Sequence, residues 1–80
     1  MTILPEQCRA ARAILGLSQD QLAEASKVAK ATIANFELGK RMPYERTLQD
    51  IREALEAAGA VFLENGVHRE GGPGVRLAKK

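Results

Sequence analysis

Hydrophobic residues recur at helical spacing along residues 4–58, between residues that begin and end helices. The first of these segments carries one apolar stripe: Leu4, Cys8, Ala11 and Leu15. Pro5 suits the first position of a helix because its missing N–H would have no helical partner there. Gly16 favours a helix end, because glycine adopts the left-handed conformation at little cost. The pattern therefore predicts a first helix from Pro5 to Gly16.

Two further helices are predicted on either side of a very short turn. Ser18 opens the second helix, and Gln21, three residues later, completes a capping box. The third helix is expected from about residue 29 to residue 38, with Ile33 and Phe36 facing inward, and Gly39 ends it. Only about three residues separate these two helices, which is the spacing of a helix-turn-helix unit.

A fourth helix is predicted after Pro43, which biases its predecessor away from helical conformations. Its apolar positions recur at helical spacing before Gly59: Leu48, Ile51, Leu55 and Ala58. The predicted fold class is therefore mainly α, with four helices, and the helix-turn-helix domain is expected to cover residues 1–59.

Residues 60–80 have a different pattern and are predicted as a β-prone tail. Two β-prone stretches, 61–63 and 75–77, flank the reversal signal Asn65-Gly66 and a glycine-rich segment that holds His68. The stretches can form a small sheet within one chain or across to a second copy. We expect the second arrangement, which makes the tail a candidate dimerisation element. Residues 1–59 should then fold alone but stay monomeric.

Composition limits the function classes that the chain can serve. Its 80 residues are 45% hydrophobic and 28% charged, which allows one small core and no enclosed cofactor pocket. No apolar run is long enough for a membrane span, and the first residues lack a signal-peptide pattern, so a cytoplasmic location is expected. Cys8 and His68 each stand alone, and no set of catalytic side chains is grouped. We expect no enzymatic activity, no metal and no cofactor.

Positive charge is concentrated in residues 27–46, which carry five basic and two acidic side chains against a net charge of +2 for the chain. A concentration of this kind is typical of a surface that faces a polyanion. The alternative is an ordinary solvated helix face.

The second and third helices carry a specific motif. It contains Leu17-Ser18-Gln19 at its start, Ala23 where two helices cross closely, Ile33, and the exit Glu37-Leu38-Gly39-Lys40-Arg41-Met42-Pro43. Residues 6–58 thereby resemble the phage-repressor/Cro-like (XRE-type) helix-turn-helix family. The resemblance implies a lambda-repressor-like four-helix fold and a sequence-specific regulator, a repressor, that binds a short palindromic double-stranded DNA operator as a homodimer.

The resemblance also assigns DNA-binding roles to individual residues: Gln19, Lys30, Ala31, Thr32, Asn35, Lys40, Arg41 and Tyr44. It places Lys30, Ala31 and Asn35 at base edges, with Thr32 near the backbone. Lys40 and Arg41 are expected along the DNA phosphates, and Tyr44 and Arg46 extend that strip. The alternative for this strip is ordinary solvated loop charge. Gln19 is expected at a phosphate beside a helix N-terminus, or else as a solvated residue. Lys30 has a phosphate contact as its alternative.

Three other positions have structural interpretations. Ala29 stands where the family usually places a serine or threonine cap, so the third helix should begin less firmly, by about 1 kcal/mol. Arg12 and Glu37 resemble the family's partly buried ion pair, which joins the first helix to the third.

Two functions from other classes remain as alternatives. The chain can be an antitoxin-like interaction module whose tail adds strands to a partner protein, with DNA binding secondary. A small hydrolase or nuclease is disfavoured because clustered catalytic side chains are missing.

Overall fold

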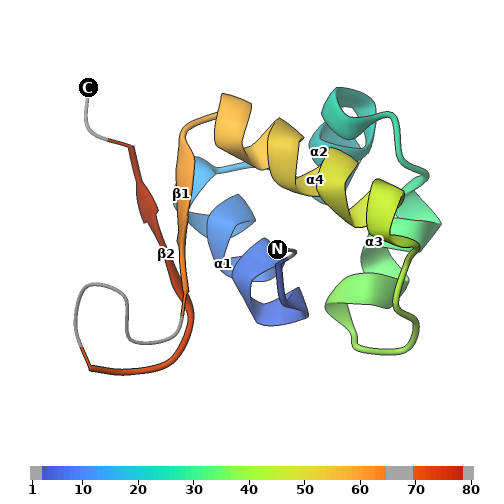
Figure 1. The fold of residues 1–80 in the computed structure, drawn as a ribbon. Coiled ribbons are helices and arrows are strands. Elements are labelled where there is room, and N and C mark those ends of the chain that lie inside the picture. The colour runs from blue at the N-terminus through green and yellow to red at the C-terminus, as the bar shows by residue number, and fades with distance from the viewer. Residues whose placement is uncertain (1–2, 65–69, 79–80) are drawn as a thin grey trace.

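The computed structural model describes residues 3–64 and 70–78, and these form four helices followed by two strands (Figure 1). The elements in order are α1 Pro5–Leu15, α2 Gln19–Ser26, α3 Lys30–Glu37, α4 Glu45–Ala57, β1 Ala60–Leu63 and β2 Gly74–Leu77. The predicted fold class, mainly α with a small C-terminal sheet, is confirmed. The reversal signal Asn65-Gly66 and His68 lie outside the described residues. No helix in the described part is long and apolar enough to cross a membrane.

Local signals set the ends of the first two helices. Gly16 ends α1 in the left-handed conformation, with φ of 72°, and its N–H donates to the Ala13 carbonyl. Ser18 caps α2: its Oγ accepts from the Gln21 N–H at 3.0 Å, and its own N–H donates to Gln21 Oε1 at 2.9 Å. Both predicted helix boundaries are therefore correct.

The turn between α2 and α3 consists of residues 27–29, as the spacing predicts. Ala29 occupies the N-cap of α3 and makes no side-chain capping bond. After α3, Gly39 takes a φ of 74° and turns the chain into the loop that leads to α4.

The apolar core is shared by all four helices and by β1. Its buried members are Ile3, Cys8, Ala11, Leu22, Val28, Ile33, Phe36, Leu48, Ile51, Leu55, Ala60 and Phe62. Two predicted stripe positions are wrong. Leu4 is 43% exposed because it precedes α1 as its extended N-cap, and Ala58 is exposed because it lies just beyond α4.

The two strands pair with each other within one chain, in antiparallel orientation, with Phe62 opposite Val75 and Ala60 opposite Leu77. The structure has the intrachain pairing, so the expected pairing of these strands across two copies is wrong for this sheet. Ala60 and Phe62 belong to the same core as the helices. Gln7 of α1 joins the sheet to the bundle: its Nε2 donates to the carbonyls of Leu63 at 3.3 Å and Gly74 at 2.9 Å.

Candidate nucleic-acid interface

Helix α3 has one buried face and one exposed face. Ile33, Phe36 and Glu37 are buried, which fixes the helix against the rest of the bundle. Lys30, Ala31 and Asn35 are exposed on the other side. These are the three positions that the resemblance assigns to base edges, and the structure brings them onto one surface.

A polar cluster around the buried Glu37 carboxylate holds α3 to α1. Arg12 binds it with two hydrogen bonds of 2.7 Å, from Nε to Oε2 and from Nη2 to Oε1. Arg9 Nη1 also donates to the Glu37 backbone carbonyl. The paired geometry is the stronger form of a carboxylate–guanidinium contact, and it fixes the rotation of α3 relative to α1.

Two more side chains complete this Glu37 cluster. Gln19 Nε2 donates to Oε1 at 2.9 Å, and the buried Cys8 Sγ donates to Oε2 at 3.1 Å. Burial by itself would raise the pKa of Glu37, but the hydrogen bonds from Arg12, Gln19 and Cys8 outweigh it and lower that pKa. Burial raises the pKa of the Cys8 thiol, and the bond to Glu37 adds to that effect. Glu37 is therefore ionised and Cys8 is a neutral donor at neutral pH.

The Glu37 cluster gives Gln19 a partner that sequence reasoning missed. The amide of Gln19 stands at the first position of α2 but points to Glu37. No sequence signal connects these residues, because they are 18 positions apart and belong to different helices. A phosphate contact by Gln19 stays a prediction.

Lys30 is also paired in the free protein. Its Nζ lies 3.3 Å from Asp20 Oδ1, and both side chains are more than half exposed. Exposed pairs of this kind contribute less than about 1 kcal/mol, so Lys30 can leave Asp20 for a DNA partner at little cost.

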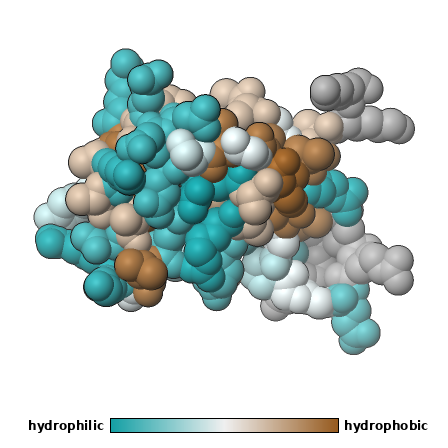
Figure 2. All heavy atoms as spheres, turned by 180° about the vertical axis from the view of Figure 1, so that it is seen from behind, coloured by the Kyte–Doolittle hydropathy of each residue, from teal (hydrophilic) through white to brown (hydrophobic). Residues whose placement is uncertain are grey.

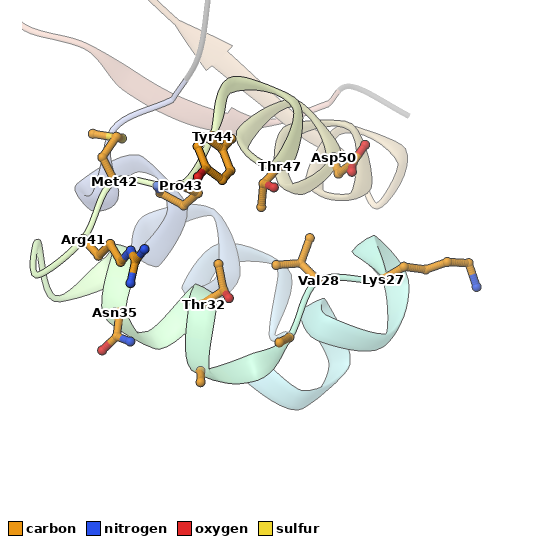
Figure 3. A pocket seen from close by; sticks show the side chains of 12 residues that line it. Lys27, Val28, Thr32, Asn35, Arg41, Met42, Pro43, Tyr44, Thr47 and Asp50 are labelled. Carbon is orange, nitrogen blue, oxygen red and sulfur yellow. The ribbon is translucent and has the colours of Figure 1, made fainter.

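A groove of about 510 Å³ runs between α3 and the start of α4 (Figure 3). Five predicted DNA-binding residues line it: Ala31, Thr32, Asn35, Arg41 and Tyr44. Gln19, Lys30 and Lys40 lie outside it. Sequence reasoning missed other lining residues, notably Lys27, Thr47 and Asp50. Lys27 belongs to the basic block of residues 27–46, which is the only sequence signal for it.

The groove combines hydroxyl groups, an amide and cations. Thr32 and Thr47 point toward each other across it, Asn35 points from the outer side of α3, and Arg41 stands at one end (Figure 3). Its carboxylate, Asp50, pairs with Arg46 at 3.5 Å. Donors and cations on a concave surface suit a sugar-phosphate backbone.

No group of three metal-ligating side chains occurs in residues 3–64 and 70–78.

Comparison with known proteins agrees with this geometry. A family model described as helix-turn-helix, of the XRE or lambda-repressor-like type, matches residues 9–58. The match covers α2, α3 and α4 completely and α1 from Arg9 onward. No curated protein matches the chain.

Proposed function

The chain belongs to the helix-turn-helix family of DNA-binding transcription regulators, and we propose that it represses transcription as a homodimer bound to a short palindromic operator. The observation that carries this proposal is the arrangement of α3. Its exposed side presents Lys30, Ala31 and Asn35, and the adjoining groove adds Arg41. Base-reading and phosphate-binding groups thus share one surface, as a helix inserted in a major groove requires.

Each exposed residue of α3 has a specific role in this proposal. Asn35 binds the N6 and N7 atoms of adenine, Lys30 donates to guanine, and Ala31 contacts a thymine methyl group. Thr32 and Tyr44 line the groove beside them and contact the backbone.

Phosphate contacts come from the loop after α3 and from α2. Lys40 and Arg41 are both exposed, so they can neutralise phosphates and release counterions. Gln19 reaches a phosphate by exchanging its bond to Glu37 for one to DNA.

A homodimer follows from the size of the recognition surface. Helix α3 has eight residues, so one copy covers only a few base pairs. Two copies on half-sites about one helical turn apart combine their affinities and read a palindrome.

Selection of bound duplexes from a random pool tests this function. We expect an enriched palindrome with half-site centres about 10 base pairs apart. Enrichment of a single half-site would contradict the homodimer, and no enrichment would contradict sequence-specific binding. Repression is then measured with a reporter gene placed behind the enriched operator.

Two substitutions separate base reading from phosphate binding on the enriched duplex. Asn35→Ala should cost about 1–3 kcal/mol and relax the preference at one base position. Lys40→Ala should weaken binding to all sequences and lower the salt slope by about one unit. Uniform weakening by both variants would contradict the two roles.

A partner-binding role of the tail is the second candidate, favoured by exposed apolar residues on the two strands. Val61 is 37% exposed on one face of the sheet, and Leu77 is 55% exposed on the other. In this alternative the chain is an antitoxin-like module whose strands bind another protein, with DNA binding secondary. The double variant Val61→Lys, Leu77→Lys should abolish association with the partner protein, as measured by co-purification. Its affinity for DNA, as measured by fluorescence anisotropy, should be unchanged. Equal co-purification of the variant would contradict this role.

A further inference from the structure

The backbone of Lys27 has an unusual conformation. It follows α2 with a φ of 61° and a ψ of 30°, and it is the one residue other than glycine with a positive φ in residues 3–64 and 70–78. Side chains with a Cβ atom adopt this left-handed region at a cost, whereas glycine enters it freely. The turn between α2 and α3 therefore carries a lysine where glycine would fit with less strain.

Contacts within the protein do not account for this lysine. The Lys27 side chain is exposed and takes part in none of the ion pairs or hydrogen bonds found among the described residues. Its neighbour Val28 supplies the apolar anchor of the turn, with 8% exposure. Lys27 thus adds strain to the free protein and no contact that offsets it.

The position of Lys27 provides a reason for its presence. It lines the groove between α3 and α4 and stands at the end opposite to Arg41 (Figure 3). The hydroxyl groups of Thr32 and Thr47 lie between these two cations. Asp50 is paired with Arg46, so Arg41 and the two hydroxyl groups are left to face a ligand inside the groove. The Lys27 side chain extends outward from the end of the groove, where a phosphate that leaves the groove would meet it (Figure 3).

We propose that the groove holds the sugar-phosphate backbone of one DNA strand and that Lys27 binds a phosphate at its end. The inference rests on the proposed DNA binding and adds a contact residue that neither the motif nor the family match assigns. The strained turn is a trade of stability for affinity: glycine would stabilise the turn, and lysine supplies a charge to the DNA backbone.

Lys27→Gly separates the two effects because it relieves the backbone strain and removes the charge together. We expect its melting temperature to rise by about 3–6 °C, since the relief exceeds the added chain entropy of glycine. Its binding to a short labelled duplex of random sequence should weaken by about fivefold to tenfold at about 0.1 M salt. The slope of log affinity against log salt should fall by about 0.9.

Three companion variants separate the charge of Lys27 from its backbone conformation and from the net charge of the chain. Lys27→Asn tolerates the left-handed backbone without the charge, so it should lose the same affinity as Lys27→Gly. Lys27→Arg should keep both the salt slope and the wild-type melting temperature. Arg76→Gln removes an equal charge from exposed β2, far from the groove in the fold, and should leave the salt slope unchanged.

The outcomes distinguish this inference from the proposed function. If wild type binds the duplex and Lys27→Gly binds it with the same salt slope, the Lys27 contact is wrong although DNA binding stands. A lower melting temperature for Lys27→Gly would overturn the trade of stability for affinity. Failure of the wild type to bind any duplex would overturn both.

Discussion

The helix-turn-helix end and the sheet end of the molecule are stabilised in different ways (Figure 1). At the helix-turn-helix end, a buried carboxylate holds α1, α2 and α3 together through Arg12, Gln19 and Cys8. At the sheet end, apolar burial of Phe62 dominates, and the amide of Gln7 adds two bonds to strand carbonyls. Directional bonds thus fix the helices that we propose contact DNA, whereas the strands close the core.

The exposed surfaces of the two ends also differ, one in apolar residues and the other in charged and polar ones. Seen from behind, brown apolar surface gathers between the two grey segments, where the strands lie (Figure 2). Val61 and Leu77 are exposed apolar residues of the strands, on opposite faces of the sheet. Lys30, Asn35, Lys40 and Arg41 are exposed at the other end. One end is therefore suited to a polyanion, and the other to an apolar surface.

The largest expected effect is that of removing residues 60–80, which tests whether the sheet end is part of the core. The deletion takes Phe62 out of the core, a loss of about 3–5 kcal/mol, and leaves the Gln7 amide without its two carbonyls. Domains of this size have only about 4–12 kcal/mol in total. We therefore expect residues 1–59 to be largely unfolded at 25 °C by circular dichroism, in contrast to the expectation from the sequence.

Point variants in β1 control for the length of the deletion. Phe62→Ala should cost about 3 kcal/mol in urea denaturation, whereas Val61→Ala, on the exposed face, should cost less than about 1 kcal/mol. A truncated chain that melts cooperatively at the wild-type temperature would show that the four helices are stable without packing against the sheet. Its oligomeric state by light scattering would then test the tail as a dimerisation element.

The next largest effect concerns the Glu37 cluster at the helix-turn-helix end. Arg12→Met and Glu37→Gln should each lower the free energy of unfolding by about 2–4 kcal/mol, because each leaves a charged or polar group in the interior without its partner. The double variant should recover part of the loss. Additive losses in this urea-denaturation cycle would show that the two side chains do not interact.

The exposed pair of Asp20 and Lys30 is the matched control for that cycle. It also joins residues of neighbouring helices, but both of its side chains are more than half exposed. Asp20→Asn and Lys30→Met should each change stability by less than about 1 kcal/mol. A coupling energy as large as that of Arg12 and Glu37 would contradict the role of burial.

The pH dependence of stability sharpens the same contrast. The pKa of Glu37 is lower in the folded protein than its ordinary value of 4.5, so ionised Glu37 stabilises the fold above that value. The contribution is lost as pH falls through the lowered, folded pKa. Wild type should therefore lose more stability than Glu37→Gln between about pH 5 and pH 2 in urea denaturation. Parallel curves for the two proteins would mean that Glu37 titrates alike in both states.

The parts of the fold that the sequence predicts correctly are those set by neighbouring residues. Gly16 ends α1 and the Ser18–Gln21 box begins α2 because their bonding partners lie within four positions. The stripe position assigned to Leu4 is wrong because Leu4 lies outside the helix, as its extended N-cap, and does not follow the helical periodicity. The partners of Gln7 are 56 and 67 positions away, so its burial depends on the folded topology.

In the candidate site as well, the sequence predicts the features that neighbouring residues determine and misses those that distant residues determine. The motif predicts that Asn35 and Arg41 share a surface, because both follow from the position of α3 and its exit loop. It does not show that the Gln19 amide turns to Glu37, since a side-chain direction depends on the opposite helix. It also gives no sign of the left-handed Lys27, because a lysine, unlike a glycine, does not mark a position with positive φ.

The smallest expected effect is at the start of α3, where the missing cap can be restored. Ala29 has the extended backbone of an N-cap, with φ of −58° and ψ of 139°, and no side-chain bond. A serine there can accept from the Ala31 or Thr32 N–H, so Ala29→Ser should stabilise the protein by about 1 kcal/mol. Ala25→Ser, in exposed α2, is the control and should be slightly destabilising, since serine is a poorer helix former than alanine. A gain in urea midpoint for Ala29→Ser alone would show that the missing N-cap of α3 lowers the stability of the helix-turn-helix end. Equal losses for both variants would mean that α3 is already held firmly by Ile33 and Glu37, without a cap.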